Sequence, residues 1–404
     1  MGRLFGSFVI KFSPASHCRV SGESLTDADL LFDLADCPFP GIYPQSAEES
    51  ASLRSPLRLV QARQSGLVQL AHVFSPACYQ DYLFAGAVSA SYVDYLRSFA
   101  RNVTAAFPRT AAVLEVGCGD GTLLGLIQAA GYSDIFGIDP GQPARQKAGK
   151  LPIASGYFPA GLPAERRAKK YDLIVTRHVL EHLETPEDFV ASMAARLQRG
   201  GQLWIEVPDL ASAVQRQIWS NFYQIHCNYF EAATLDALLA KFGLGCRGGE
   251  VVESFGGSLV RRYEFGSVLA APVATRWNSL AARIGEYERQ LGALAERMPA
   301  GCVGYGAAER TAVTFGFCPA LAAKLRCLYD GNPLLAGRFL GGTSLPIRLK
   351  SELFKNPPSA IVLFAISHAR EILAEFKTIL PGKVLIGLAG ADFRCQPLAD
   401  FPSP

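Results

Sequence analysis

The sequence lacks a strong excess of charge of either sign. Its 404 residues include 39 lysines and arginines against 36 aspartates and glutamates, a formal net charge of +3 with neutral histidines. Proteins that bind nucleic acids or membrane surfaces through a basic field carry a larger imbalance. The composition therefore argues against both partners. Hydrophobic residues make up 49% of the chain and charged residues only 19%, which indicates a globular protein with a large core rather than a disordered one.

Long apolar runs are also missing. A membrane-spanning helix needs about 18 consecutive apolar residues, and the longest runs here, such as residues 360–366, have the length of a buried strand. The apolar patch near the N-terminus ends at Lys11, and no signal-peptide cleavage site follows it. The ten cysteines lack the spacing of a disulfide framework. We therefore expect a soluble, cytoplasmic protein with reduced thiols.

The chain divides into segments that differ in their pattern. At roughly 150 residues per domain, its length suggests two or three domains, each with its own core. Residues 1–85 mix proline, serine and cysteine with short apolar pieces, which is typical of a small irregular module. Residues 86–270 alternate apolar runs with helical stretches, which predicts an α/β fold with a doubly wound parallel sheet covered by helices. Residues 300–404 resume this alternation and predict a second, smaller Rossmann-like α/β domain.

Residues 271–299 have the pattern of one long amphipathic helix that links these two domains. Apolar side chains recur there every three or four residues, and Pro299 ends the pattern. The apolar positions are Trp277, Leu280, Ile284, Tyr287, Leu291, Leu294 and Met298.

The strongest local motif starts at Val113. A buried strand there runs into three glycines, Gly117, Gly119 and Gly121, and then into a helix. Glycines allow a tight turn and a close approach of the backbone to a ligand, because a β-carbon would collide with it. About twenty residues later, Asp139 ends the next strand, where a carboxylate can accept both hydroxyls of a ribose. The motif predicts a site for a cofactor that contains adenosine.

The residues around these glycines favour one such cofactor. Glu115 precedes the first glycine and Asp120 lies among them, and this Glu-x-Gly-x-Gly-x-Gly pattern resembles the class I S-adenosylmethionine methyltransferases. A pyrophosphate would be disfavoured beside Asp120 at a helix N-terminus, whereas the sulfonium cofactor has no phosphate and carries a cation. A dinucleotide pocket and a loop without any ligand are the alternatives. The resemblance implies that Asp120 or the adjacent backbone faces the cofactor's amino-acid portion, Asp139 its ribose, and Tyr157 and Phe158 its adenine.

Two histidines follow the strand that begins at Tyr171. Ligands in open α/β sheets bind beyond the carboxyl ends of the strands, so His178 and His182 are expected where substrate meets cofactor. In the helix predicted after this strand, their spacing of four residues puts them on the same face. We expect His178 to cap or pack on the cofactor side of the site and His182 to act on the substrate.

From end to end, the chain resembles the three-domain C-methyltransferases of deoxysugar pathways, which combine a zinc-binding module, a methyltransferase domain and a C-terminal Rossmann-like domain. The matching stretches are the glycine loop and residues 18–22, 66–70, 81–82, 181–182, 226–230, 256–259, 304–307 and 332–347. The resemblance implies that S-adenosylmethionine methylates the carbon next to the ketone of a nucleotide-linked keto-deoxysugar, leaving S-adenosylhomocysteine. The sugar would lie between the last two domains.

The resemblance also implies catalytic roles. A base must remove the proton next to the ketone, and the enolate then attacks the sulfonium methyl group. A neutral imidazole suits this task. By residue-for-residue match, His182 and His226 correspond to two active-site histidines of the family, and Tyr223 to a tyrosine in the same site. The residues expected to contact the substrate are Tyr82, Ile225, Phe255, Ser258, Tyr305 and Arg338.

The chain departs from the family at the zinc site. The first pair of zinc cysteines reads Cys18 and Ser21 here, and the second pair reads Ala62 and Ser65. Structural zinc is held by four Cys or His ligands, so we expect this site to be empty and the chain to have no metal ligands. The alternative is a replacement ligand set of His17, Cys37 and Cys78.

Other departures concern the acceptor. The family's glutamate before the second histidine is Ile225, and its histidine before Gly-Gly-Ser is Phe255. In the C-terminal domain, a Trp-Asn pair reads Ile366 and Ser367, and the histidine of a Gly-Thr-His-Ile-Pro motif is Ser344. These changes leave the cofactor motif intact but make a wall of the active site less polar.

Three functions are consistent with these residues. The first is C-methylation of a nucleotide-linked keto-deoxysugar in natural-product or antibiotic biosynthesis. The second uses the same cofactor but methylates oxygen, nitrogen or carbon of a small, less polar intermediate. The third is a non-methylating protein that binds or rearranges a substrate. In each case we expect a small-molecule partner and neither nucleic acid nor membrane.

Overall fold

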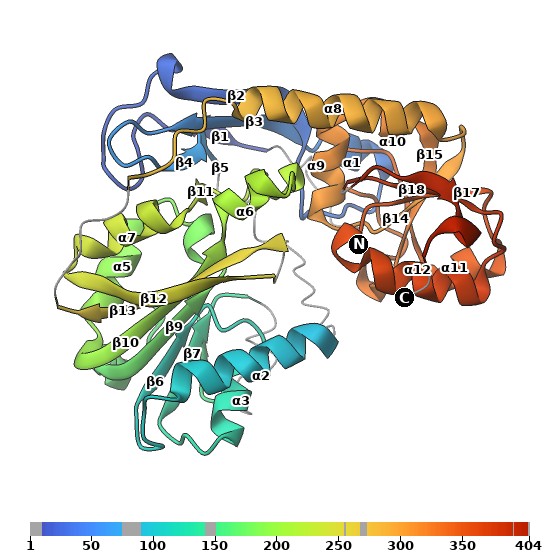
Figure 1. Ribbon diagram of the computed structural model, residues 1–404. Coiled ribbons are helices and arrows are strands. Elements are labelled where there is room, and N and C mark those ends of the chain that lie inside the picture. The colour runs from blue at the N-terminus through green and yellow to red at the C-terminus, as the bar shows by residue number, and fades with distance from the viewer. Residues whose placement is uncertain are drawn as a thin grey trace, which may run out of the picture.

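The structure is a computed structural model that describes residues 10–74, 90–141, 151–253, 256–266, 273–390 and 392–402. It is an α/β protein with three larger sheets and one two-stranded ribbon (Figure 1). Tyr82, Phe255 and Cys78, which the sequence analysis singled out, lie outside the described residues. Among the helices that are described, none is long and apolar enough to cross a membrane.

The N-terminal segment forms an antiparallel sheet in the order β11-β4-β3-β2. In β3, Leu57 and Leu59 are buried on either side of the partly exposed Arg58. This period of two is the sign of a half-buried strand, and it continues through the partly exposed Pro56 to the buried Ser55. The sequence analysis expected an irregular module here and did not predict these strands. The elements are β1 (Phe12–Pro14), β2 (Leu30–Pro38), α1 (Ala47–Ala51), β3 (Arg54–Gln61), β4 (Val68–Leu70), β5 (His72–Phe74) and, from far downstream, β11 (Asn228–Tyr229).

The two turns at which the resemblance places zinc ligands are joined by hydrogen bonds. The Sγ of Cys18 lies 3.2 Å from the hydroxyl of Ser65. The Oε1 of Glu23 accepts bonds from the hydroxyl of Ser21 at 2.9 Å and from the backbone N–H of Gln64 at 2.8 Å. Cys37 belongs to a different buried cluster from Cys18. Side-chain and backbone hydrogen bonds therefore connect these turns.

The central sheet has seven strands in the order β12-β13-β10-β9-β6-β7-β8. It is parallel except for β13, which pairs antiparallel with β10 and β12. The strands are β6 (Val113–Val116), β7 (Ile135–Asp139), β8 (Ile153–Ser155), β9 (Tyr171–Arg177), β10 (Leu197–Pro208), β12 (Leu244–Val252) and β13 (Ser258–Phe265). Such a sheet opens its ligand site at the carboxyl ends of the parallel strands.

Helices cover both faces of this sheet because its strands are apolar on both sides. In β9, Leu173 and Val175 pack on one face with α2 and α3, whereas Ile174 packs on the other with α5 and α7. The segment η4, a 3₁₀ turn, follows β9, and another such turn, η5, precedes β11. The elements are α2 (Ala90–Thr104), α3 (Thr122–Ala129), η3 (Ala164–Arg166), η4 (Leu180–His182), α5 (Pro186–Ala194), α6 (Leu210–Gln215), η5 (Trp219–Asn221) and α7 (Ala232–Ala240).

The C-terminal unit is a second α/β sheet, in the order β16-β15-β14-β17-β18-β19, and only β19 is antiparallel. The long helix α8 (Leu280–Arg297) precedes it and runs along the N-terminal sheet towards this unit (Figure 1). The remaining elements are β14 (Cys302–Tyr305), α9 (Glu309–Phe317), α10 (Pro319–Lys324), β15 (Leu325–Asp330), η7 (Pro333–Leu335), β16 (Ile347–Leu349), α11 (Lys350–Lys355), β17 (Ala360–Leu363), η8 (Ile366–His368), α12 (Ala369–Ile379), β18 (Leu385–Leu388), β19 (Cys395–Pro397) and η9 (Leu398–Asp400).

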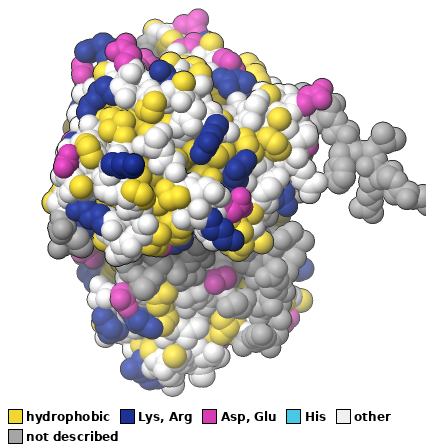
Figure 2. Space-filling model, turned by 90° about the vertical axis from the view of Figure 1, so that its right-hand side faces the viewer, with side chains coloured by type: hydrophobic (Ala, Val, Ile, Leu, Met, Phe, Trp, Pro, Cys, Tyr) yellow, Lys and Arg dark blue, Asp and Glu magenta, His cyan; other side chains and the backbone are white. Residues whose placement is uncertain are grey.

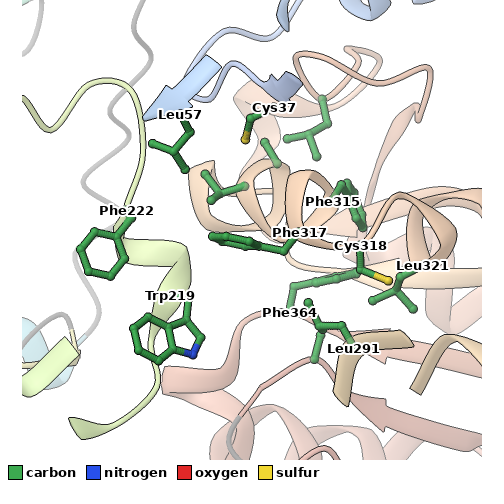
Figure 3. Close-up of a cluster of buried hydrophobic side chains, with 14 of the residues drawn as sticks. Cys37, Leu57, Trp219, Phe222, Leu291, Phe315, Phe317, Cys318, Leu321 and Phe364 are labelled. Carbon is green, nitrogen blue, oxygen red and sulfur yellow. The ribbon is translucent and has the colours of Figure 1, made fainter. Parts of the chain in front are cut away.

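One apolar core is shared between parts of the chain that are far apart in sequence. Figure 3 shows Cys37 and Leu57 of the N-terminal sheet near Phe317 of α9, with Trp219 of η5 and Leu291 of α8 in the same cluster. The expectation of a separate core is therefore wrong for the N-terminal sheet, whereas the C-terminal unit also has a buried cluster of its own. A small sheet exposes too much of its surface to stand alone, and the N-terminal sheet buries one face against the C-terminal unit instead.

Polar contacts strengthen the same junction. The hydroxyl of Ser50 donates to the carbonyl of Leu340 at 2.8 Å, and the backbone N–H of Phe339 donates to the carbonyl of Pro44 at 2.9 Å.

On the face of the molecule drawn in Figure 2, lysines and arginines are scattered among hydrophobic side chains rather than gathered in one patch. This face therefore carries no concentrated basic field.

The junction yields a prediction from two glycines with the same backbone conformation. Gly342 and Gly337 have φ angles of 77° and 76°. A β-carbon on Gly342 would lie 2.4 Å from the Cα of Pro38, whereas one on Gly337 would meet no atom within 4 Å. We expect Gly337→Ala to cost about 1 kcal/mol of unfolding free energy through strain alone, and Gly342→Ala at least about 2 kcal/mol more, because the backbones must separate. Urea unfolding measures both, and equal losses would contradict the packing described here.

Candidate active site

The glycine loop joins β6 to α3 at the carboxyl end of the central sheet. Gly117, Gly119 and Gly121 have φ angles of 78°, 54° and 75°, in the left-handed region that favours glycine. A β-carbon on Gly117 would lie 2.2 Å from Cγ2 of Val179, so this glycine allows the loop to pack against the segment after β9. A β-carbon on Gly119 would meet nothing within 4 Å. The backbone at Gly119 therefore borders open space that a ligand can enter.

Asp139 fixes the loop from the end of the neighbouring strand. Its Oδ2 accepts the backbone N–H of Gly119 at 2.9 Å, and its Oδ1 accepts the backbone N–H of Gly141 at 2.6 Å. Asp120 has a local task, because its Oδ1 accepts both the N–H of Thr122 at 3.0 Å and the hydroxyl of Thr122 at 2.6 Å at the start of α3. Both carboxylates thus lie at the loop, and Asp139 connects it to β7.

Glu115 lies in the buried middle of β6. Burial, partly offset by the charge of Arg177, raises the pKa of its carboxyl to about 8, so the group is mostly protonated at neutral pH. Its Oε2 has no hydrogen-bond partner among the described residues. Glu115 is therefore a neutral, buried group next to the loop rather than a carboxylate in open solvent.

The two aromatic residues expected near adenine lie in different surroundings. Phe158 packs edge-on against Phe189 with ring centroids 5.5 Å apart, and the guanidinium of Arg196 lies 5.4 Å from its ring. Tyr157 is 74% exposed. The preceding residue, Gly156, donates its N–H to the carbonyl of Asp139 at 3.1 Å, so Tyr157 lies beside the carboxyl end of β7. The contacts of Phe158 anchor this turn, and the side chain of Tyr157 is exposed to solvent.

A buried set of charges lies at the ends of β9 and β10. The Nε of Arg177 is 2.6 Å from Oε2 of Glu206, and the Nε2 of His178 is 3.2 Å from Oε1 of the same glutamate. The Nδ1 of His178 also lies 3.4 Å from Oε1 of Glu181. Burial disfavours a charged His178, but Glu206 and Glu181 outweigh it and raise the pKa of the imidazole to about 9. His178 is therefore protonated at neutral pH.

Helix α2 covers the same charges. The guanidinium of Arg177 lies 5.0 Å from the ring of Phe99 and 5.6 Å from that of Tyr95, and its Nη2 donates to the hydroxyl of Tyr92 at 3.2 Å. Burial alone would raise the pKa of Glu206, but the charges of Arg177 and His178 lower it to about 2. A buried ion pair of this kind holds its partners in fixed positions.

The predicted helix after β9 is wrong, and so is the shared helical face of its two histidines. His178 has a φ of 52°, residues Leu180–His182 form the 3₁₀ turn η4, and the α-helix begins only at Pro186. His178 consequently faces Glu206, whereas His182 faces another segment. The proline at the first helical position was the signal for this later start.

His182 and His226 come together from distant parts of the sequence. Their rings lie 4.9 Å apart, edge to face. Nδ1 of His182 donates to the carbonyl of Ile225 at 2.7 Å, because a carbonyl can only accept, and this leaves Nε2 with its lone pair. Nε2 of His226 is 2.8 Å from the hydroxyl of Tyr223. Burial and the positive charges around it hold the pKa of His226 well below its usual value, so this imidazole is neutral.

An amide that the sequence analysis missed holds the two segments together. Asn228 is fully buried, and its Nδ2 donates to the carbonyls of Leu180 at 3.0 Å and Leu183 at 2.7 Å. The Sγ of Cys227 also points to the carbonyl of His182 at 3.6 Å. These bonds place η4 against the residues that follow η5. The proximity of Asn228 to His226 in sequence was the one available signal for this role.

Three further predicted residues belong to other segments than the two histidines. Tyr305 packs against Phe376 in the core of the C-terminal unit, with ring centroids 5.0 Å apart. The Nη1 of Arg338 donates to the carbonyl of Tyr43 at 3.0 Å, at the junction with the N-terminal sheet. Ser258 is buried at the start of β13. Tyr82 and Phe255 lie outside the described part of the chain.

Comparisons with known proteins identify the two α/β units. A family model described as a methyltransferase domain matches residues 90–247, and a model described as a C-methyltransferase C-terminal domain matches residues 272–386. The C-methyltransferase NovU of Streptomyces niveus is 24% identical to this chain over 402 residues, covering 91% of this chain and 93% of that protein. A tRNA U34 carboxymethyltransferase of Idiomarina loihiensis is 31% identical over 102 residues, 23% of this chain and 32% of that protein.

A solved structure of magnesium protoporphyrin IX methyltransferase from Synechocystis PCC 6803 with bound SAM is 18% identical to this chain, with a TM-score of 0.34. The match covers 43% of this chain and 80% of that one. The family models carry the identification, because they match both units in the order found here. A small-molecule acceptor is consistent with such an enzyme. The glycine loop, with open space at Gly119 and Asp139 beside it, fits the methyl donor of this class. The chain therefore combines a methyltransferase domain with a C-methyltransferase C-terminal domain, and it is a methyltransferase that uses S-adenosylmethionine.

Proposed function

We propose that the chain methylates the carbon next to the ketone of a nucleotide-linked keto-deoxysugar, as a step of natural-product biosynthesis. The observation that carries the proposal is the neutral, buried His226 paired with His182 beside the segment that packs on the donor loop. The near full-length relative named as a C-methyltransferase supports carbon as the acceptor atom. The nine cysteines of the described residues are free thiols, which supports a cytoplasmic location.

The donor would be held mainly by Asp139 and the backbone of the glycine loop. A carboxylate offers about four lone-pair sites, and Asp139 uses two of them for Gly119 and Gly141, so it can also accept the hydroxyls of a ribose. The exposed ring of Tyr157 supplies a face for the adenine. The negative charges of Asp120 and Asp139 favour a cationic cofactor. S-adenosylmethionine supplies the electrophilic methyl group.

The two imidazoles would carry the proton chemistry. His226 is neutral because it is buried, and His182 keeps the lone pair on Nε2 because Nδ1 donates to Ile225. Either ring can therefore accept the proton that must leave before carbon attacks the methyl group. Tyr223 orients His226 through the bond to Nε2. A general base of this kind contributes about 10²- to 10⁴-fold to a rate.

The C-terminal unit reaches this site through the first turn of α9. Nη1 of Arg310 lies 3.4 Å from the hydroxyl of Ser367, and the charge of Arg310 contributes to the low pKa of His226. A β-carbon on Gly256 would lie 3.8 Å from Nη1 of Arg310. A cation between the two sheets suits the diphosphate of a nucleotide-linked sugar, which supports an acceptor held between the methyltransferase and C-terminal units.

A less polar acceptor is the second candidate. It was inferred from the apolar residues Ile225 and Phe255, and the structure weakens the argument from Ile225. Ile225 is 2% exposed and its side chain belongs to the shared core, so its carbonyl, rather than an apolar wall, faces His182. The other support, Phe255, lies outside the described residues. The described residues therefore favour the keto-sugar.

Isotope loss tests the acceptor atom. The chain is incubated with S-adenosylmethionine and thymidine or uridine diphosphate-linked keto-deoxysugars that carry deuterium next to the ketone. We expect S-adenosylhomocysteine and a product that has gained one methyl group and lost that deuterium, measured by mass spectrometry against an enzyme-free control. Replacing His226 by Ala should lower the rate about 10²- to 10⁴-fold, while His17→Ala, at a histidine outside this cluster, should not. A methylated product that keeps its deuterium would show oxygen or nitrogen methylation.

Two aspartates at opposite ends of β7 test the donor site. Asp139 ends the strand at the glycine loop, whereas Asp134 precedes it and pairs with Arg166 and Lys169. We expect Asp139→Asn to weaken the binding of S-adenosylhomocysteine at least tenfold, about 1.4 kcal/mol, because the ribose loses a charged acceptor. Asp134→Asn should leave it within a factor of two. Calorimetric titration measures both, and equal affinities would show that the ribose lies elsewhere.

A further inference from the structure

Arg19 links the N-terminal sheet to the segment that carries His226. Its Nη1 donates to the carbonyl of Leu70 at 2.9 Å and to the carbonyl of Cys227 at 3.1 Å. Its Nη2 donates to the carbonyl of His72 at 2.9 Å. Leu70 ends β4 and His72 begins β5, whereas Cys227 directly follows His226 in sequence. One guanidinium therefore connects two strands of the N-terminal segment to the neighbour of a candidate base.

Strand pairing reinforces this link. β11 pairs antiparallel with β4, beside which it lies in Figure 1. The backbone N–H of Leu70 donates to the carbonyl of Cys227 at 3.0 Å. This carbonyl thus accepts two hydrogen bonds, one from the main chain and one from Arg19. A carbonyl oxygen has two lone pairs, so both are engaged and the orientation of this peptide is fixed.

Cys227 lies between two residues that place the imidazoles. On one side, His226 supplies the buried, neutral ring. On the other side, the amide of Asn228 donates to two carbonyls that flank His182 in sequence. A displacement of Cys227 would therefore move both rings relative to the donor loop. A misplacement of about 1 Å in an active site can lower a rate about 10²-fold.

The backbone of Arg19 is itself held in place. Its N–H donates to Oε1 of Gln69 at 2.9 Å, and Nε2 of Gln69 donates to the carbonyl of His17 at 3.1 Å. Gln69 is fully buried in β4. The main chain and the side chain of Arg19 are therefore both attached to the strand that pairs with β11.

Arg19 belongs to the first of the two turns at which the resembling family holds zinc. Of the four ligand positions of that family, only Cys18 carries a thiol here, and an ion that needs four Cys or His ligands does not fit this set. The carboxylate of Glu23 joins the two turns instead, through the hydroxyl of Ser21 and the backbone N–H of Gln64. Hydrogen bonds between protein groups therefore hold the turn that carries Arg19.

An arginine suits this position because its planar guanidinium presents five N–H donors in a fixed fork and keeps its charge. Lysine has three donors on a flexible stem, and glutamine has two donors and no charge. Neither reproduces the fork that serves the carbonyls of Leu70, His72 and Cys227.

We propose that Arg19 is a positioning residue for methyl transfer. By holding the carbonyl of Cys227, it fixes His226 directly and His182 through Asn228. The inference rests on the proposed role of these two histidines. It gives a part in the reaction to the N-terminal segment, which lies outside the residues that the two family models match.

A split between turnover and donor affinity tests this role. Arg19→Gln removes the charge and the fork, and Arg58→Gln, at an arginine of β3 that pairs with Asp33, is the matched control. We expect Arg19→Gln to lower kcat for the keto-sugar at least about tenfold, because both rings shift. Its dissociation constant for S-adenosylhomocysteine should stay within about a factor of two, because Arg19 has no contact with the glycine loop. Arg19→Lys should have an intermediate kcat, and Arg58→Gln should change neither quantity.

Hydrogen–deuterium exchange follows the same segment without any acceptor. The backbone amides of residues 226–229 should exchange at least about tenfold faster in Arg19→Gln than in the unchanged chain or in Arg58→Gln, whereas those of residues 117–122 should not change. Unchanged exchange at residues 226–229, or a kcat within about a factor of two of the unchanged chain, would overturn the inference.

Two further outcomes are decided in advance. If Arg19→Gln fails to fold, as judged by its thermal unfolding, Arg19→Lys replaces it in both measurements, with at least about a threefold effect expected. If the unchanged chain methylates no keto-sugar, the proposed function fails, and the exchange rates alone decide whether Arg19 holds the segment of His226.

Discussion

The buried ion pair between Arg177 and Glu206 is the interaction on which the active site depends. It joins the carboxyl ends of β9 and β10, at a distance of 2.6 Å, under the aromatic side chains of α2. Breaking such a pair costs roughly 3–5 kcal/mol, because the remaining charge stays buried. Glu206 also holds the protonated His178, whose left-handed backbone turns the chain into η4. The position of His182 follows from this turn.

Residues 223–228 supply the other imidazole of the site, that of His226. Hydrogen bonds, rather than strand pairing, align this segment with η4, which carries His182. The carbonyl of Ile225 accepts a hydrogen bond from the imidazole of His182, and the side-chain amide of Asn228 donates to the carbonyls of Leu180 and Leu183 on either side of that histidine. Such bonds are strongest where water is excluded, and these residues are buried between the central sheet and the shared core. The imidazoles can therefore be held at a fixed distance from the donor loop.

The sequence predicts those features that depend on neighbours along the chain. The glycine loop and Asp139 were identifiable because the turn needs positive φ angles at fixed spacing, and the structure shows these angles at all three glycines. Features that depend on distant partners were not predictable. Asn228 is a residue of ordinary type whose task appears only when η4 lies against it. Tyr305 follows a glycine motif, but the parity of β14 turns its ring into the core, towards Phe376.

The shared core limits prediction for the same reason. Its members come from the N-terminal sheet, η5, α8 and the C-terminal unit. The hydrophobic pattern of the sequence shows that each of these residues is apolar, but it does not show which residue it packs against. The prediction of separate cores assumed that each segment buries its own surface, and the small N-terminal sheet does not. That arrangement matters for function, because it holds Arg310 of the C-terminal unit close enough for its charge to lower the pKa of His226.

A crystal structure with S-adenosylhomocysteine tests the central claim that the loop and the histidines form one site. The account predicts that the ribose hydroxyls lie within hydrogen-bond distance of Asp139 and that the sulfur faces the rings of His182 and His226. A product molecule whose ribose lies away from Asp139, or whose sulfur points away from both rings, would contradict it.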